Sequence, residues 1–521
     1  MGPTAFPFWH AVWNCSRPWN RSFEMIFVFG PRVQLGTINF LSLNVAFRFA
    51  LRRGLAILLS RWFGLVMGYP GGLGFWDILV APRRVIGGRP WTPVLAFRLQ
   101  PREWKRVYAD TLLACDRTLK RGMVTLQQGI KKGPGTKSGP QVAVIGGSAS
   151  GFFTASLLAR AGCAVEVLER SDQFDPTPRT LIVTSHMRTL LGQIGDAAVV
   201  NEIRKFELFT DGRTAQVPLD RPDLIIERSR LIRDLASDAE SHGAKVSFGN
   251  RFVDLQSNGT GLRVNVERAQ DARIEELHAD VVVGADGALS RVAQSAGWPR
   301  QPTVPLVQAI VRVPADMSPN TVRVWFIPDD TPYFYWLIPE SSERAVLGLI
   351  GEDGQETRRC LERFMEKRGF TPLGYQGARI PVYDRWTPVE RRVGAGRVFL
   401  VGDAAGQVKV STVGGIVTGF RGAIGVTESI MNGGESRELR SLRRELDLHL
   451  LIRKTIHQFK QADYSRLVDL MNDSTRRSLS QYTRDEASRV LWNIALSQPR
   501  LLLLALRGLL SGGSILPKNR G

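Results

Sequence analysis

A carboxylate and a pair of glycines lie close together in RVFLVGDAAGQVKVSTVGGIVTG, residues 397–419. Asp403 follows an apolar stretch, Val398 to Val401, that predicts a buried strand. A carboxylate at a strand end can accept hydrogen bonds from sugar or ribityl hydroxyls. Gly414 and Gly415 open a predicted helix, where bare N–H groups and the positive end of the helix dipole can meet a flat ring. The alternative is a Gly-Asp turn with no ligand.

A second glycine-rich turn lies upstream in QVAVIGGSASGFFTASLLARAGCAVEVLER, residues 141–170. Its pattern predicts a strand, a turn, a helix and a second strand, which is the context of a dinucleotide-binding fingerprint. Gly146 suits the tight turn, Gly151 allows the helix to approach the strand, and Glu169 ends the second strand. Ser148 replaces the middle glycine but is small enough for a pyrophosphate to approach. A purely structural glycine turn is the competing interpretation.

A third motif, DVVVGADGALSRVA, covers residues 280–293. An apolar strand is predicted before Asp286 and Gly287. Asp-Gly favours turns, so by itself this motif indicates an ordinary type I turn. Its weight comes from its place between the two other motifs.

The three motifs in this order resemble the FAD-binding domain of the family that includes para-hydroxybenzoate hydroxylase, geranylgeranyl reductases and flavin-dependent halogenases. The resemblance runs from Gln141 to the C-terminus and implies an α/β fold, with FAD as cofactor. The ADP half, the flavin and the ribityl region would be held by residues that match the family's motifs. These are Gly146, Ser148, Gly151, Glu169, Arg170, Arg228, Asp286, Gly287, Asp403, Gly414 and Gly415.

Within that family, GDAAGQVKVSTVGGI is most similar to the geranylgeranyl reductase branch, whose pattern looks like GDAA-x-QVK-x-TTGGGI. Val413 replaces the first of three glycines. The resemblance implies reduction of isolated double bonds in geranylgeranyl or related polyprenyl chains by hydride transfer from reduced flavin. An FAD-dependent monooxygenase acting on an apolar or aromatic substrate is the alternative within the fold, and a membrane-associated scaffold with an inactive flavin fold is the alternative from another class.

An aromatic stretch, YFYWLIPESSERAVLGLIG, covers residues 333–351 and resembles a segment that the reductases and halogenases share. Phe334, Trp336 and Ile338 alternate along a predicted strand, so they share one face and are candidates for an apolar substrate pocket. The competing interpretation is that they are core residues of a sheet, as most strand aromatics are.

Ionisable candidates for catalysis are few. The resemblance implies a lysine between Arg170 and Lys205 in a halogenase, and none occurs there, which disfavours that branch. The reductase branch often has a cysteine in the stretch that reads PRTLIVTSHMRTLLG here, where this chain offers Ser185 and His186. His186 could assist proton delivery, because imidazole titrates near neutral pH, or could be a surface or capping histidine.

The cysteines predict no metal site. Cys15, Cys115, Cys163 and Cys360 are scattered and include no CxxC pair, which indicates neither zinc, an iron–sulfur cluster nor a disulfide framework. Electrons must then come from outside, and NAD(P)H or ferredoxin is the expected donor.

Positive charge is concentrated at the N-terminus. Residues 1–140 hold 20 Lys and Arg against 5 Asp and Glu, within a formal net charge of +20 for the 521-residue chain. No nucleic-acid-binding module is recognisable. The apolar stretches Val33 to Leu51 and Gly54 to Gly68 are interrupted by arginines and short for a membrane span. This part could be an interfacial anchor, a poorly structured extension, or a segment outside a working protein that starts near Met123.

The organisation predicted is a Rossmann-like FAD-binding domain, a substrate domain with an antiparallel sheet, and a C-terminal helical region. Expected bounds are 1–139 for the basic extension, 140–300 and 385–435 for the two parts of the FAD domain, 301–384 for the substrate domain and 436–521 for the helices. Leucines with Arg500 and Arg507 in the last helix suit a membrane surface, where an isoprenoid lipid would reside. We expect a cytoplasmic protein with peripheral membrane contact.

Overall fold

The computed structural model describes residues 8–14, 22–28, 79–81, 94–96 and 139–510, which fall into two units, 1–134 and 135–521. In the first unit, four strands form a sheet in the order β2-β1-β4-β3. They are β1 (Phe8–Asn14), β2 (Ser22–Val28), β3 (Leu79–Ala81) and β4 (Val94–Ala96). The sequence pattern had predicted no strands here. Segments such as FWHAVWN combine aromatic and branched residues, which favour strands without strict alternation. The stretches 33–51 and 54–68 and the start at Met123 lie outside the described residues.

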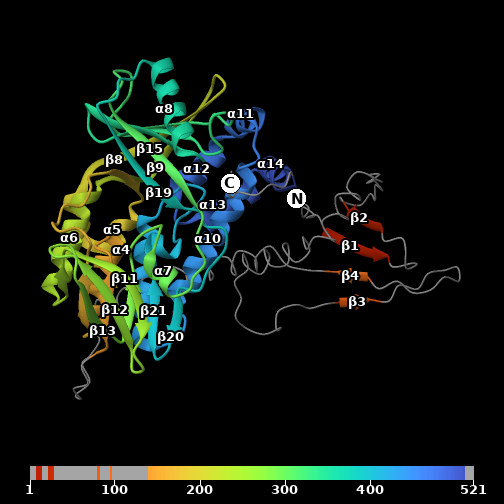
Figure 1. The fold of residues 1–521 in the computed structure, drawn as a ribbon. Coiled ribbons are helices and arrows are strands. Elements are labelled where there is room, and N and C mark those ends of the chain that lie inside the picture. The colour runs from red at the N-terminus through yellow and green to blue at the C-terminus, as the bar shows by residue number, and fades with distance from the viewer. Residues whose placement is uncertain (1–7, 15–21, 29–78, 82–93, 97–138, 511–521) are drawn as a thin grey trace. The chain divides into compact units, whose positions relative to one another are not determined.

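A six-stranded sheet forms the centre of the second unit, in the order β10-β6-β5-β14-β21-β20 (Figure 1). All neighbours in it are parallel except the edge pair β20–β21. Its inner strands, such as β5 and β14, are buried apolar runs, as is typical of parallel sheets covered on both faces. They are β5 (Gln141–Ile145), β6 (Ala164–Leu168), β10 (Lys245–Ser247), β14 (Val281–Gly284), β20 (Glu390–Val393) and β21 (Gly396–Leu400).

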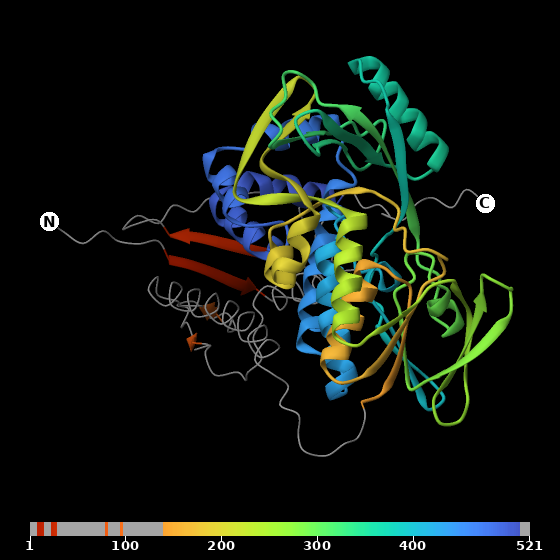
Figure 2. The same cartoon turned by 90° about the vertical axis from the view of Figure 1, so that its left-hand side faces the viewer.

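Helices cover one face of this sheet and a small antiparallel sheet covers the other. The helices α4 (Ala149–Arg160), α6 (Arg228–Ser241) and α9 (Ile416–Asn432) lie side by side (Figure 2). The opposite face packs against β11 (Asn250–Ser257), β12 (Leu262–Arg268) and β13 (Ile274–Ala279). The result is the Rossmann-like layer arrangement that the sequence predicted.

An eight-stranded sheet lies beside the first, in the order β19-β15-β18-β17-β16-β8-β9-β7. Its pairs are antiparallel except β16–β8, which is parallel, so the sheet is mixed. Strands from the predicted substrate segment are β15 (Thr303–Arg312), β16 (Thr321–Trp325), β17 (Tyr335–Pro339), β18 (Arg344–Ile350) and β19 (Gly374–Pro381). The sheet also takes in β7 (Thr180–Val183), β8 (Val199–Thr210) and β9 (Arg213–Glu227), from the stretch that the sequence assigned to the first part of the FAD domain. Long-range pairing of this kind leaves no local signal.

Each face of the eight-stranded sheet has its own apolar core. One face packs against α8 (Gly354–Arg368), and the other packs against Val408, Val410 and α10 (Arg437–Ile456). Because side chains alternate along a strand, Tyr335 and Leu337 join the first core while Trp336 and Ile338 join the second. The second core therefore joins the sheet to the loop that follows β21.

Short helices complete the structure. They are α5 (His186–Leu191), α7 (Arg291–Ser295), α11 (Gln461–Asp469), α12 (Asp473–Gln481), α13 (Ala487–Ser497) and α14 (Pro499–Leu510), with the 3₁₀ segments η1 (Gly192–Ala198) and η2 (Gly402–Ala405). Helix α12 packs on β9 and α14 packs on α10. Among the described residues, no helix is long and apolar enough to cross a membrane.

Candidate flavin-nucleotide site

The first glycine-rich turn joins β5 to α4 and closes on itself. Gly146 has φ +106°, a value that side chains rarely allow, and a Cβ there would lie 2.7 Å from the carbonyl oxygen of Ala285. At Gly151 a Cβ would lie 2.3 Å from the carbonyl oxygen of Gly146. The Ser148 hydroxyl caps α4 by accepting from the Gly151 N–H at 3.1 Å. These small residues leave a cradle of backbone at the start of a helix.

Glu169 lies beside this turn, at the end of β6. Its carboxylate accepts hydrogen bonds from the N–H of Gly147 at 2.6 Å and from the N–H of Ser171 at 3.0 Å. A carboxylate has about four lone-pair positions, so it can still accept from a ribose. Arg170, which follows, is exposed. Backbone N–H groups thus hold the carboxylate of Glu169, the expected acceptor, beside the turn.

Asp286 stabilises the turn after β14. Its carboxylate accepts from the Ser290 hydroxyl at 2.6 Å and from the N–H groups of Arg291 at 2.7 Å and Val292 at 3.2 Å. Burial raises the pKa of Asp286, and these hydrogen bonds oppose the rise. Gly287 has φ +85°. Asp286 and Gly287 therefore determine the conformation of the turn after β14.

The second turn contains Asp403 and the glycine pair. Gly402 has φ +64°, and its N–H donates to the Gln407 side-chain oxygen at 2.7 Å. A Cβ on Gly415 would lie 3.2 Å from an Asp403 carboxylate oxygen. Asp403 and Gly415, twelve positions apart in sequence, are therefore neighbours, at the N-terminus of α9.

Two arginines face Asp403, and sequence reasoning identified only one of them. Arg228 begins α6, and its N–H donates to the carbonyl oxygen of Arg179 at 3.0 Å. Burial and, to a smaller extent, the Arg228 charge lower the pKa of Arg179 to about 10, and Asp403 opposes the shift. Burial also raises the pKa of Asp403, and the two arginines oppose that rise. The only signal of Arg179 in the sequence is a charge placed directly before the apolar strand β7.

Some polar atoms in this part of the structure have no hydrogen-bond partner. The Nε atom of Arg179 and the hydroxyl of Thr412 are buried without a hydrogen-bond partner. Within residues 139–510, no group donates a hydrogen bond to the Asp403 carboxylate, which is half-buried. Buried polar groups normally find partners. Cationic donors, a hydroxyl and a carboxylate acceptor fit a cofactor that carries phosphates and sugar or ribityl hydroxyls.

The predicted pocket residues Phe334, Trp336 and Ile338 share one face of the eight-stranded sheet. The Phe334 and Trp336 rings are 6.1 Å apart at 70°, an edge-to-face pair. A Cβ on Gly348 would lie 2.7 Å from the Trp336 ring, so this glycine leaves the space in which the indole lies. All three side chains belong to the apolar core that also holds Val408 and Val410 of the second turn. They pack as core residues and at the same time adjoin the second turn.

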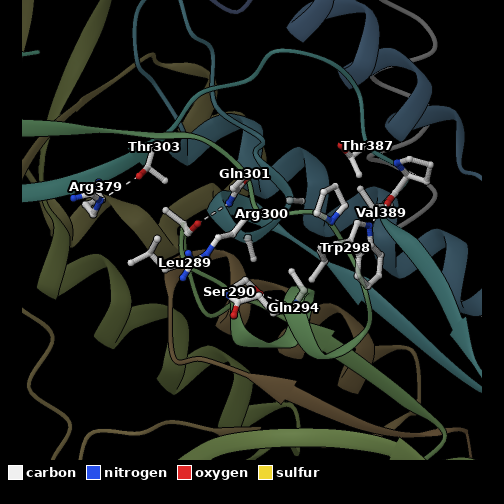
Figure 3. A pocket seen from close by; sticks show the side chains of 17 residues that line it. Leu289, Ser290, Gln294, Trp298, Arg300, Gln301, Thr303, Arg379, Thr387 and Val389 are labelled. Atoms are coloured by element: carbon white, nitrogen blue, oxygen red, sulfur yellow. Dashed lines mark hydrogen bonds between the residues drawn. The ribbon is translucent and has the colours of Figure 1, made fainter. Parts of the chain in front are cut away.

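A cavity of about 390 Å³ borders the two carboxylate-bearing turns (Figure 3). Its lining includes Ser290, Arg300, Gln301 and Ala404. The Gln301 side chain donates to the carbonyl oxygens of Ala288 at 2.9 Å and Asp403 at 2.7 Å, which ties the turns together. Sequence reasoning missed this cavity, because its walls come from separate segments.

His186 does not reach this cavity. It begins α5, and its Nδ1 lies 4.0 Å from an Asp485 carboxylate oxygen. Burial lowers the pKa of His186, and Asp485 opposes the shift. Within the described part of the chain, no group of three or more His, Cys, Asp or Glu could hold a metal, and the described cysteines, Cys163 and Cys360, are free and buried.

The Rossmann-like sheet, its glycine-rich turn and the arginine–aspartate cluster define a dinucleotide-binding flavoprotein fold. A family model described as "FAD binding domain" matches residues 140–431, more than half of the chain. The chain therefore belongs to the FAD-binding domain family of oxidoreductases, in its geranylgeranyl reductase-like group.

Named relatives agree with this placement. Digeranylgeranylglycerophospholipid reductase 2 of Methanothermobacter thermautotrophicus is 30% identical over 308 residues, which cover 53% of this chain and 73% of that protein. Digeranylgeranylglycerophospholipid reductase of Methanothrix thermoacetophila is 25% identical over 359 residues, covering 63% and 90%. A geranylgeranyl bacteriochlorophyll reductase-like protein from Thermoplasma acidophilum has the same fold, with a TM-score of 0.59, 17% identity and coverage of 71% and 99%.

Proposed function

We propose that this protein reduces isolated carbon–carbon double bonds in geranylgeranyl or related polyprenyl chains, with NAD(P)H or ferredoxin as the external electron donor. The observation that carries the proposal is the single apolar core shared by the aromatic strand and the second turn. An isolated alkene has no polar handle, so a site for it must be apolar and adjoin the cofactor. The names of the relatives support the same substrate class.

In this proposal, FAD would supply a hydride to one alkene carbon when it is bound and reduced, and a proton would add to the other carbon. Gly146, Gly151 and Glu169 would hold the ADP half, and Asp403 would accept from the ribityl hydroxyls. Arg179 and Arg228 bring positive charge to the same place. The N-terminus of α9 follows Gly414 and Gly415, so its dipole favours negative charge beside the glycine pair.

The aromatic strand would orient the alkene and exclude water. Trp336 and Ile338 are buried and Phe334 is half-buried, so the face they form is apolar throughout. Water exclusion matters because it strengthens the electrostatic interactions inside the site and prevents side reactions. We propose these three side chains as the walls that receive the isoprenoid chain.

The test is anaerobic incubation of the dithionite-reduced, FAD-loaded protein with geranylgeranyl lipids, followed by mass spectrometry. Products heavier by two hydrogens per bond are expected. Protein reoxidised before the lipid is added is the matched control. Unchanged lipid, or rapid NADPH oxidation in air with a hydroxylated product, would contradict the proposal, and the second outcome would favour a monooxygenase.

We also propose that α14 contacts the membrane that holds the substrate. Its inner face is buried through Leu501 and Leu504, whereas Leu503 and Leu506 are 67% and 49% exposed beside the exposed Arg500. Exposed leucines with an arginine suit an anionic lipid surface. The double variant Leu503→Asp with Leu506→Asp should sediment less with vesicles of anionic phospholipid than the wild type does. Wild-type protein that does not sediment with such vesicles would contradict the proposal.

A further inference from the structure

A buried ion pair lies beneath the second turn. The Lys409 ammonium and the Asp485 carboxylate are in hydrogen-bond contact, and their side chains are 5% and 1% exposed. Lys409 belongs to the turn, whereas Asp485 lies 76 positions later, between α12 and α13. The Thr184 hydroxyl also donates to Asp485, from the connection between β7 and α5.

Lys409 holds the turn with its backbone as well as its side chain. Its N–H donates to the Gly414 carbonyl at 3.1 Å, and its own carbonyl accepts from the Val413 N–H at 2.7 Å. The side chain then runs under the glycine pair, because a Cβ on Gly414 would lie 3.1 Å from Lys409 Cε and 3.5 Å from its Nζ. The ammonium thus sits directly below the backbone that we expect to face the flavin ring.

The turn needs such a support. Val413 has φ +56°, in the left-handed region that disfavours a β-branched residue. A conformation of this kind persists only where surrounding contacts impose it. The hydrogen bonds to Lys409 are such contacts, and Asp485 anchors Lys409 in turn.

Other charges surround the pair and are themselves matched. Arg484 contacts Asp223 at 2.7 Å, and Arg421 contacts Glu438 at 2.5 Å. His186 adds an imidazole 4.0 Å from Asp485. Because the neighbours are already paired, removing either Lys409 or Asp485 leaves one buried charge without its counter-charge, which is the costly state for an ion pair.

We propose that Asp485 is a positioning residue for the flavin. Its ion pair with Lys409 ties the C-terminal helices to the 409–415 turn, so that this turn takes its ring-binding shape only with those helices in place. The inference rests on FAD binding and on the expected position of Gly414 and Gly415 at the ring. It does not depend on which lipid is reduced.

The charges of the pair lead to a prediction about the flavin midpoint potential that a purely structural role would not. In Asp485→Asn an uncompensated positive charge lies under the ring site, which stabilises the reduced, more negative flavin and raises its midpoint potential. In Lys409→Met the uncompensated charge is negative, which lowers that potential. We expect shifts of opposite sign, each equivalent to about a tenfold change in the two-electron equilibrium, or ~30 mV.

The experiment measures the FAD dissociation constant and the flavin midpoint potential, without lipid, for both single variants and for Lys409→Met with Asp485→Asn. Single variants should bind FAD at least tenfold more weakly. The double variant carries no unpaired charge, so its potential should return to the wild-type value while its FAD affinity remains at least tenfold weaker, because the tie is gone. Far-UV circular dichroism checks the fold of each.

The matched control is Asp469→Asn, which breaks the exposed pair between Arg213 on β9 and Asp469 on α11, in the same helical region. It should leave FAD affinity and potential unchanged. Potentials that shift in the same direction, or single variants indistinguishable from this control, would overturn the proposal. If the single variants do not fold, a double variant with wild-type FAD affinity would overturn it and a weakened one would support it.

Discussion

The two glycine-rich turns of the candidate nucleotide site are held in different ways. The turn at Gly146–Gly151 is held by neighbours in its own strand–helix–strand unit, as Ser148 caps α4 and Glu169 binds Gly147. The turn at Gly402–Gly415 is held from far away, by Gln301 and Asp485. The first is a local structure that a short segment encodes, and the second is assembled by the tertiary fold. Substitutions within its own segment should therefore disturb the first turn. The second turn should also be disturbed by substitutions at positions far away in the sequence.

The largest expected effect is at the local turn. Gly151→Ala places a Cβ 2.3 Å from the Gly146 carbonyl oxygen, and only a shift of the backbone can relieve this contact. We expect FAD binding to weaken at least hundredfold, measured by fluorescence titration of the apoprotein. Gly374→Ala is the control, because its Cβ would make an ordinary contact of 3.6 Å. Equal affinity in the two variants would mean that the first turn does not cradle the cofactor.

A second effect tests the arginine that the sequence did not reveal. Arg179→Gln removes a buried guanidinium that faces Asp403 and has an unpartnered Nε. A hydrogen bond from a charged group contributes about 1.5–3 kcal/mol, so FAD affinity should fall about tenfold to a hundredfold. The control is Arg233→Gln on α6, where the side chain is 46% exposed, and it should change FAD affinity little. An unaffected Arg179→Gln variant would remove this residue from the site.

A third test uses pH to probe the support of the second turn. Burial lowers the folded-state pKa of His186, so the unfolded chain binds more protons as pH falls through the ordinary histidine pKa of about 6.5. This contribution to stability is complete above that pH and is lost below it. His186→Gln should therefore lose less unfolding free energy than wild type between neutral and mildly acidic pH, measured with urea.

The charged groups that act on His186, namely Asp485, Arg421, Glu438 and Glu486, are the same in both proteins, so the comparison isolates the imidazole. Identical losses in the two proteins would contradict the buried, neutral state of this imidazole. A variant that binds FAD normally but fails to reduce lipid would instead support His186 in proton delivery.

The smallest effect concerns strain in the second turn. Val413→Gly relieves a left-handed valine, which costs about 1–2 kcal/mol, and loses a partly buried side chain in return. We expect the free energy of unfolding to change by less than about 1 kcal/mol. Val410→Gly, in the same core and 4% exposed, should cost about 3 kcal/mol. Equal costs would show that the backbone at Val413 is not strained.

Several features follow from the sequence alone. Spacing within short segments predicts the β5–α4–β6 unit and the strand β17, along which Trp336 and Ile338 alternate with Tyr335 and Leu337. The resemblance of the three motifs identifies the family, which the matched residues 140–431 confirm. These predictions succeed because hydrogen bonds and side-chain alternation within a few residues depend on local order alone.

Only the tertiary structure decided the rest. It placed Arg179 opposite Asp403, brought Asp485 under Lys409 across 76 positions, and added β7, β8 and β9 to the eight-stranded sheet. Such contacts require the closure of long loops, and many partners of the same charge compete for each site along the chain. Burial then selects among them, because an unpaired charge in the interior costs more than any local preference can offset.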